Sequence, residues 1–349
     1  MQFSKEEILQ PQSIPAAKSE RISTRWLVLS AGKSPFFHAS SYADNLQESL
    51  TKRHKRAIRV ESSNIIADSI TSIRKLVRLI PQFDSIQLMY DGTVSFSKSI
   101  LPAAVIARFF GKRAALLYNP DQIVDEIPRW HRRAMLLCSN VYVGTRYLKR
   151  ELAKQNVKSE VMLPPVSTSA LPARTIREIQ PHILLVNNSA VDSGAICAMR
   201  AFIMVKHKYP RTTMTVVTDE PVRWLMGVMQ LGQNIQGHDY VSPHKEQDVK
   251  KIFGEADLFV NCSASEAAPS ALLAAMATGM PSISFETYGA REIIENGING
   301  LLIRHNDHNQ LAEEIIRLIE EPALAPQMSK EAAKLRAKVT VENIVRYLQ

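Results

Sequence analysis

The chain has 349 residues, a length that suits two domains of ordinary size or one large α/β domain. Hydrophobic residues make up 45% of the sequence and charged residues 22%, which excludes collagen-like, low-complexity and wholly disordered chains. No window approaches the ~18 uninterrupted apolar residues of a membrane span. The polar first residues lack the basic head and apolar stretch of a signal peptide, so we expect a cytoplasmic protein.

Positive charge is concentrated in the first half of the chain. Residues 1–170 hold 25 Lys and Arg against 14 Asp and Glu, a net charge of +11, whereas the remaining residues carry −2. The basic runs are KRHKRAIR (52–59), RWHRR (129–133) and RYLKRELAK (146–154). A basic face can meet nucleic acid, an anionic membrane surface or a phosphorylated substrate, or it can be a solvated surface without a partner. Charge alone does not choose among these.

The first half alternates short apolar runs with helical patterns. Residues 1–24 are polar and contain Pro11 and Pro15, so we expect a mobile leader before the first strand. The apolar runs predict strands at 26–30, 85–90, 114–118 and 141–144. The helical patterns predict helices at 42–50, 65–80, 101–110 and 147–154.

The stretch VMLPPVSTSALPA (161–173) interrupts this alternation with three prolines, as a domain boundary does. A second series follows it. We expect strands at 182–187, 213–218, 257–261 and 281–285 and helices at 194–207, 221–229, 246–253 and 269–278. After residue 301 the pattern is helical to the end.

Repeated β-α units predict an α/β fold with doubly wound parallel sheets. We expect two Rossmann-like domains that face a cleft, an N-terminal domain over 25–165 and a C-terminal domain over 166–349. The sequence contains no G-x-G-x-x-G, Walker, H-E-x-x-H or G-x-S-x-G motif, so dehydrogenase, P-loop, zinc-protease and hydrolase functions lose their main support. Cys138, Cys197 and Cys262 lack metal-binding spacing and are predicted to be buried or partly buried thiols.

Residues 256–303 carry the most informative pattern. A strand leads to a short loop with one acid, Glu266, and then to a helix that starts near Pro269; a second strand and a turn with Gly297 and Gly300 follow. Proline suits a first helical turn because its missing N–H costs nothing there. The N–H groups of Ser270 and its neighbours would face the cleft and suit a diphosphate. A plain βαβ unit, with Glu266 as a surface or capping acid, fits the same pattern.

The amino-acid sequence of this stretch resembles the donor-binding segment of family 4 (group 1) retaining glycosyltransferases, which have the GT-B fold. The acid is followed by small residues and proline (267–270), then by AMATGMP (275–281) and by GAREIIENGINGLL (289–302). The first half is similar more loosely, through SAGKSP (30–35) and residues 138–166. The resemblance spans residues 26–345 and indicates a divergent member of the family.

The resemblance implies roles for particular residues. Glu266 would hold the hydroxyls of the transferred sugar, and the loop at Gly32 and Lys33 would close the cleft from the N-terminal domain. An N-terminal-domain histidine of the family, close to the reacting sugar, maps to Asn119. The backbone that would meet the donor diphosphate belongs to Ala267, Ala268, Pro269 and Ser270.

The sequence departs from the family at three charged positions. The second acid of the motif, a ligand of the nucleotide ribose, maps to Ala274. The cations that neutralise the diphosphate after the first strand of the C-terminal domain map to Asn188 and Ser193. Lys33 and Arg291 are candidates to replace that charge, and both also suit a surface role.

The sequence thus predicts a glycosyltransferase that moves a sugar from a nucleotide-sugar donor to a glycan or lipid-linked acceptor. The nucleotide sugar is a co-substrate, and neither a further cofactor nor a metal is expected. The alternative is a catalytically silent relative that binds a nucleotide sugar, a glycan or a partner enzyme. The aromatic fraction of 7% and the lack of an RNA- or DNA-reading motif argue against nucleic acid as the partner.

The segment SITSIRKLVRLI (69–80) has an apolar stripe beside a basic one. The basic stripe holds Arg74, Lys75 and Arg78, a pattern typical of an interfacial helix on an anionic membrane and also of any helix that covers a sheet. The apolar stripe consists of Ile70, Ile73, Leu76, Val77 and Ile80. A peripheral position at the inner face of a membrane is therefore a further expectation.

Overall fold

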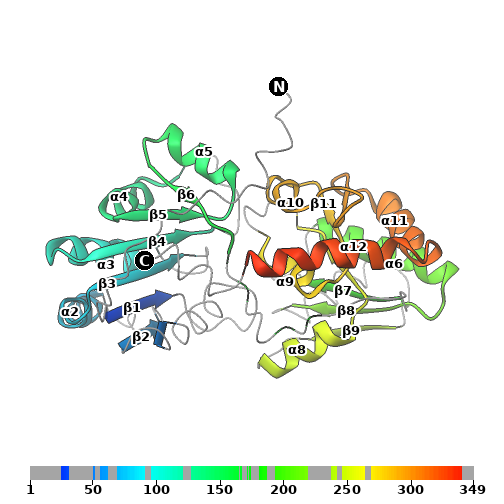
Figure 1. The fold of residues 1–349 in the computed structure, drawn as a ribbon, viewed down its shortest axis with the longest axis horizontal. Coiled ribbons are helices and arrows are strands. Elements are labelled where there is room, and N and C mark those ends of the chain that lie inside the picture. Colours follow the sequence, from blue (N-terminus) through cyan, green and yellow to red (C-terminus); the bar gives the residue numbers. More distant parts are fainter. Residues whose placement is uncertain are drawn as a thin grey trace.

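The computed structural model describes most of the chain and resolves two parallel sheets. The described residues are 25–30, 50–51, 56–61, 69–90, 96–120, 127–164, 166, 171, 173, 181–186, 193–218, 237–241, 246–263 and 269–339. Figure 1 shows one sheet with its helices at each end of the long axis of the molecule. The predicted leader (1–24) and the predicted helix at 221–229 lie outside the described residues, as does the helix predicted at 42–50 except for Leu50.

The first sheet has six parallel strands in the order β2-β1-β3-β4-β5-β6. Its core strands are short apolar runs that are buried on both faces, as parallel strands covered by helices must be. The strands are β1 (Arg25–Ser30), β2 (Arg56–Glu61), β3 (Ser85–Tyr90), β4 (Arg113–Tyr118), β5 (Asn140–Val143) and β6 (Glu160–Val161). Strand β2 corrects the sequence prediction, which took its residues only as part of a basic run.

Four helices cover one face of this sheet. From β2 to β6 the chain moves across the sheet in one direction, and right-handed crossovers therefore place these helices on the same side. They are α2 (Ser69–Leu79), α3 (Phe96–Phe109), α4 (Arg129–Leu137) and α5 (Arg146–Lys154), with the short 3-10 turn η3 (Ile80–Gln82) after α2. Helix α3 packs between α2 and α4.

The second sheet also has six parallel strands, in the order β12-β11-β10-β7-β8-β9. They are β7 (His182–Val186), β8 (Thr213–Val217), β9 (His238–Val241), β10 (Leu258–Asn261), β11 (Ser282–Phe285) and β12 (Leu301–Ile303). The helices are α6 (Ser193–Lys208), α8 (Glu246–Glu255), α9 (Ser270–Thr278), α10 (Tyr288–Ile293), α11 (His308–Glu320) and α12 (Leu324–Ala333), followed by the 3-10 turn η4 (Lys334–Ala337). Strands β9 and β12 were not expected, because neither is a long apolar run.

Helix α9 is the centre of the second domain. Every residue from Ala271 to Thr278 is buried, so the helix has no solvent-exposed face beyond its first residue, Ser270. It ends at Gly279, whose φ of 86° is the left-handed conformation that glycine adopts at low cost. A helix held this firmly fixes the position of its first residues.

The two domains are confirmed as parallel α/β units, each with its own hydrophobic core. All three cysteines are free; Cys197 and Cys262 are buried and Cys138 is partly buried, as expected. Across the described ranges, the structure contains no helix that is both long and apolar enough to cross a membrane.

Candidate functional site

The strand order of the second sheet indicates at which edge a ligand would bind. The chain runs from β7 to β8 and β9 on one side and later returns to β10, β11 and β12 on the other. The carboxyl ends of β7 and β10 therefore flank a topological switch point, where loops diverge and open α/β sheets bind their ligands. The loops that leave these two strand ends contain Asn188 and Glu266, which sequence analysis had singled out.

Most of these loop residues lie outside the described part of the chain. Glu266, Ala267 and Ala268 fall between Ser263 and Pro269, and Asn188 falls between β7 and α6. Ser193 is the first residue of α6, directly after the β7 loop; its backbone is helical and its side chain is not described. The anchors of both loops nevertheless lie on neighbouring strands, because Leu184 of β7 pairs with Phe259 of β10.

The N-terminus of α9 lies at this same edge. Pro269 is the residue before the helix, with φ −73° and ψ 85°, and it supplies no side-chain cap. Ser270 begins the helix and is half-buried. The first N–H groups of a helix carry partial positive charge and attract anions. The chain order of β10, the segment that contains Glu266 and α9 is the one that the sequence predicted.

Buried polar side chains connect the ends of β10 and β11. Asn261 donates from Nδ2 to Oγ of Ser284 at 3.2 Å, and its Oδ1 accepts from the backbone N–H of Ser263 at 3.4 Å. Ser284 donates in turn to the carbonyl of Phe285. Asn261 and Ser284 are both buried, so these hydrogen bonds satisfy groups that would otherwise be costly at the base of the Glu266 loop.

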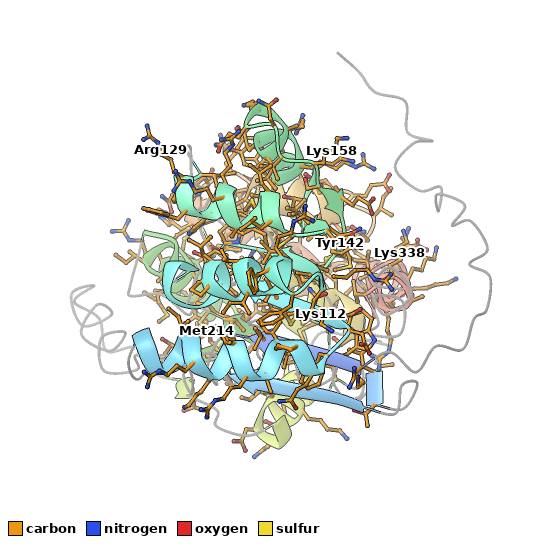
Figure 2. All side chains as sticks on the ribbon, turned by 90° about the vertical axis from the view of Figure 1, so that its left-hand side faces the viewer. Lys112, Arg129, Tyr142, Lys158, Met214 and Lys338 are labelled. Carbon is orange, nitrogen blue, oxygen red and sulfur yellow. The ribbon has the colours of Figure 1, made fainter. Side chains whose placement is uncertain are left out.

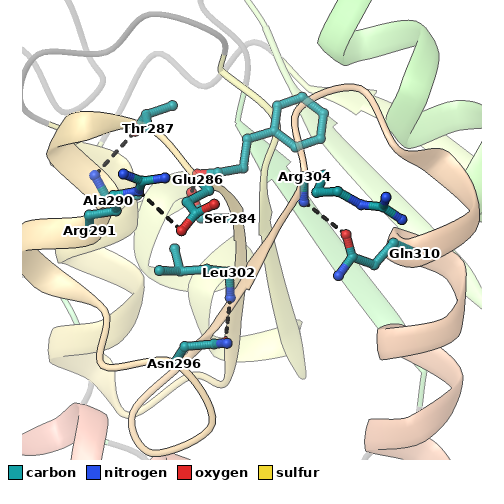
Figure 3. A network of polar contacts seen from close by, with 10 residues as sticks. Ser284, Glu286, Thr287, Ala290, Arg291, Asn296, Leu302, Arg304 and Gln310 are labelled. Carbon is teal, nitrogen blue, oxygen red and sulfur yellow. Dashed lines mark hydrogen bonds and ion pairs between the residues drawn. The ribbon is translucent and has the colours of Figure 1, made fainter.

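A network of capping contacts shapes the turn after β11 (Figure 3). Thr287 caps α10 by accepting from the N–H of Ala290 at 3.1 Å, and Arg291 pairs with Glu286 at 3.1 Å. Asn296 accepts from the N–H of Leu302 at 2.9 Å and so closes the turn onto β12. Arg291, one of the cations considered as a replacement for the missing diphosphate ligands, is thus balanced by a neighbouring carboxylate.

Ala274 occupies a fully buried, apolar position in α9. Its side chain is 0% exposed and belongs to the hydrophobic core around α9. An ionised acid in this environment would cost several kcal/mol unless it were paired. An alanine at the position to which the second motif acid was assigned from the sequence therefore suits its apolar surroundings.

In the N-terminal domain, Asn119 follows the carboxyl end of β4 at the corresponding edge of the sheet. Its N–H donates to the carbonyl of Tyr90 at 2.9 Å, and its Oδ1 accepts from the N–H of Gly144 at 2.8 Å. Asn119 thus links the ends of β3 and β5. Gly32 and Lys33, which follow β1, lie outside the described residues.

An aromatic cluster beside Asn119 was not expected from the sequence. The rings of Tyr90 and Tyr118 stack with centroids 5.2 Å apart, and the Tyr118 hydroxyl lies 3.1 Å from Nδ1 of His131. Burial lowers the pKa of His131 to about 4 and raises the pKa of Tyr118 above its usual range. Both groups are therefore neutral near pH 7, and the cluster lies at the carboxyl edge of the sheet.

The two domains meet where a carboxylate of one caps a helix of the other. Glu292 of α10 accepts from the N–H groups of Arg146 and Tyr147, at 2.7 and 2.9 Å, in the first turn of α5. Thr145 caps the next N–H of that helix. The rings of Tyr147 and Tyr288 stack across the same junction with centroids 4.4 Å apart. Glu292 lies within the motif segment 289–302, but only the three-dimensional structure reveals this contact.

Comparison with known proteins finds a family match over the second domain. Residues 180–335 match the model of the family described as Glycosyl transferases group 1. An exopolysaccharide phosphotransferase of Streptomyces coelicolor is 30% identical over 181 residues, which cover 51% of this chain and 18% of that protein. An uncharacterized glycosyltransferase of Haemophilus influenzae is 19% identical over 284 residues, which cover 79% of this chain and 78% of that protein.

Similarity of structure extends over both domains. The crystal structure of Anabaena HepE in complex with UDP and glucose superposes with a TM-score of 0.72 and 14% identity, covering 93% of this chain and 98% of that one. At this identity the likeness concerns the fold alone. It confirms the GT-B arrangement that the sequence predicted.

Proposed function

Because residues 180–335 belong to the group 1 glycosyl transferases, we propose that the protein moves a sugar from a nucleotide-sugar donor to a glycan or lipid-linked acceptor. The observation that carries this proposal is the N-terminus of the buried helix α9 at the switch point of the second sheet. A fixed set of N–H groups at that edge suits the diphosphate of a donor. HepE, which shares the fold, has been crystallised with UDP and glucose.

In this proposal, the donor lies against the C-terminal domain. Glu266 accepts hydrogen bonds from the hydroxyls of the sugar, and Ala267, Ala268, Pro269 and Ser270 present backbone to the diphosphate. Asn188 and Ser193 lie on the other side of the switch point and contribute neutral hydrogen-bonding groups. The loop with Gly32 and Lys33 approaches from the N-terminal domain, and Asn119 lies near the reacting sugar.

The proposed reaction is transfer with retention of the anomeric configuration. The bond between the anomeric carbon and the diphosphate oxygen breaks, and an acceptor hydroxyl forms the new bond as it loses its proton. The negative charge that develops on the departing diphosphate is what the α9 N–H groups stabilise. Positioning of donor and acceptor supplies a further large part of the rate enhancement. No metal or further cofactor enters the proposed step.

One observation favours a second candidate, a protein that binds a nucleotide sugar, a glycan or a partner enzyme without transferring sugar. Ala274 replaces the ribose-binding acid and is packed into the core. Neutral Asn188 and Ser193 also replace cations that would stabilise the leaving group, and losing one such preorganised group commonly costs ~10²- to 10³-fold in rate. Donor binding without turnover would identify this candidate.

We place the proposed activity in the cytoplasm, at the inner face of a membrane when the acceptor is lipid-linked, as part of glycan or polysaccharide biosynthesis. The basic N-terminal half would bring the protein to anionic lipid, and no contribution from nucleic acid is required.

The test is a thermal-shift titration with UDP-glucose, UDP-N-acetylglucosamine, GDP-mannose, UDP and GDP. A ligand at ~100 times its dissociation constant should stabilise the fold by ~2.7 kcal/mol, a readable shift. Glu266→Ala should weaken the sugar-specific part of the shift, and the shift by the free diphosphate should persist. Glu313→Ala, which removes an exposed acid on α11 outside the motif segment, is the matched control. If no nucleotide shifts the wild-type melt, the proposed donor site is wrong.

A further inference from the structure

Two tyrosines stack across the junction between the domains, and one of them remains open to solvent. Tyr147 belongs to α5 and Tyr288 to α10; their ring centroids are 4.4 Å apart, with an angle of 16° between the ring planes. Tyr147 is half-buried, whereas Tyr288 is 53% exposed. Because one face of the Tyr288 ring lies against Tyr147, its exposed surface is the other face and the edge of the ring. Such a ring offers an apolar face and a polar hydroxyl to a ligand.

The tyrosine pair lies at the carboxyl ends of strands from both sheets. Helix α5 begins at Arg146, soon after β5 ends at Val143. Helix α10 begins at Tyr288, soon after β11 ends at Phe285. Figure 1 shows α5 and α10 on the same, upper side of the molecule, where the two domains meet. Since open α/β sheets bind their ligands at the carboxyl ends of the strands, a ligand on this pair would touch both domains beside the proposed transfer site.

Three cations of α5 border the tyrosine pair. Arg146, Lys149 and Arg150 are exposed, and no carboxylate in the part of the chain that the structure describes lies within ion-pair distance of them. Their spacing of three and four positions places them on one face of the helix, and Arg150 is also three positions from Tyr147. Together with Tyr147 and Tyr288 they form what we call the junction surface.

The carboxylates close to the junction surface are engaged elsewhere. Glu292 caps the first turn of α5 through its two carboxylate oxygens. Glu286 pairs with Arg291 at 3.1 Å, and Glu151 pairs with Lys154 at 2.7 Å. The three cations of the junction surface are therefore in excess, and their charge is available to an anionic ligand.

We infer that an acidic glycan, a chain of sugars that carry anionic groups, binds on the junction surface. The inference rests on the proposed function, because this glycan is the acceptor, and its sugars beyond the one that is joined lie across α5 and α10. The apolar face of one sugar stacks on Tyr288, and the anionic groups of its neighbours accept hydrogen bonds from Arg146 and Arg150. A single-stranded nucleic acid stacks successive bases on several rings, whereas the described residues of α5 and α10 offer one open ring.

The inference is tested by calorimetric titration of the full chain, without donor. The probes are oligogalacturonate, chondroitin sulfate oligosaccharides and neutral maltose oligosaccharides of matched length. We expect the acidic probes to bind more tightly than the neutral one, and salt to weaken their binding. Tyr288→Ala should lower the affinity for the acidic probes roughly tenfold, whereas Tyr288→Phe, which keeps the ring, should bind as the wild type does. Arg146→Gln/Arg150→Gln should also lower it roughly tenfold.

Matched controls lie on other helices of the N-terminal domain. Figures 1 and 2 place α2 and α5 at opposite edges of the helix layer, and Lys158, which follows α5, is near the upper edge in Figure 2. Arg74→Gln/Arg78→Gln removes two exposed cations from α2, and Phe109→Ala removes an exposed ring at the end of α3. Both controls should bind the acidic probes as the wild type does. A melting curve of each variant verifies the fold, because Tyr288 also joins the domains.

Equal affinity for acidic and neutral probes, or equal affinity of the wild type and the variants of the junction surface, would overturn the inference. So would tighter binding of single-stranded DNA or of anionic vesicles than of the acidic probes, if Tyr288→Ala weakens it. Failure of the inference is distinguishable from failure of the proposed function. A thermal shift with a nucleotide sugar and no preference for acidic probes would remove the inference alone, and acidic-probe binding that needs Tyr288 without any nucleotide shift would remove the donor site alone.

Discussion

Removal of the Glu292 carboxylate should loosen the junction between the domains. Glu292 accepts two backbone N–H groups at 2.7 and 2.9 Å, both in the first turn of α5. Loss of a capping side chain costs ~0.5–2 kcal/mol, and loss of a negative charge at a helix N-terminus costs a further ~0.3–1 kcal/mol. Because the side chain is half-buried, we expect Glu292→Ala to lower the free energy of unfolding by about 1–2 kcal/mol.

The assay is calorimetric unfolding together with small-angle scattering of the folded protein. Glu292→Ala should lower the melting temperature by a few degrees and broaden the range of distances between the domains. Glu292→Gln keeps an acceptor without the charge, so its effect should be intermediate. Glu295→Ala is the control, because Glu295 is an exposed acid three residues away. If Glu292→Ala melts and scatters like Glu295→Ala, the hydrogen bonds across the junction contribute nothing to its stability.

Other described residues give three further predictions. His131 is neutral in the folded protein because burial lowers its pKa from 6.5 to about 4. As the pH drops, the unfolded chain therefore takes up a proton at this histidine before the folded protein does. The free energy of unfolding should fall as the pH drops from about 6.5 to 4, by no more than ~1.4 kcal/mol per pH unit. Denaturant melts across this range should be flatter for His131→Asn, and an equal slope would contradict the assignment. Gly254 lies in α8, where an added Cβ would meet no atom within 4 Å, so Gly254→Ala should raise the free energy of unfolding by ~0.4–1 kcal/mol. Gly279 has a φ of 86°, so Gly279→Ala should lower the free energy of unfolding by ~1 kcal/mol. Urea melts of the two variants should therefore show changes of opposite sign. Burial raises the pKa of the Cys138 and Cys197 thiols to about 12, so neither should react with a neutral-pH alkylating agent until the chain unfolds, which mass spectrometry can show.

The architecture was readable because parallel strands that are buried on both faces appear as apolar runs. Strands β3, β4, β7, β8, β10 and β11 all follow this rule. Strand β2 was missed because its arginines interrupt the apolar run that is typical of a buried strand. It lies at the edge of the sheet, where it pairs with β1 alone. Strand β12 was missed because it has three residues and its place is set by pairing with β11 rather than by a local pattern.

The candidate site was predictable only in part. The motif segment indicated the order of β10, the Glu266 loop and α9, and topology alone then places that loop at the switch point. The contact of Glu292 with α5 was not predictable, since it joins residues 146 positions apart. The exposure of Ile73 and Val77 was also not predictable, because an apolar stripe in the sequence does not show which of its residues pack against the sheet.

Sugar transfer itself tests the central claim most directly. The donor that gives the largest thermal shift is incubated with a lipid-linked acceptor preparation, and release of nucleoside diphosphate and formation of the product are followed together. The wild type should release diphosphate and form product in equal amounts, with the donor's anomeric configuration retained in the product's NMR spectrum. Glu266→Ala should be slower by roughly 10²- to 10³-fold. Donor binding without release of diphosphate, or equal rates for the wild type and Glu266→Ala, would contradict the account.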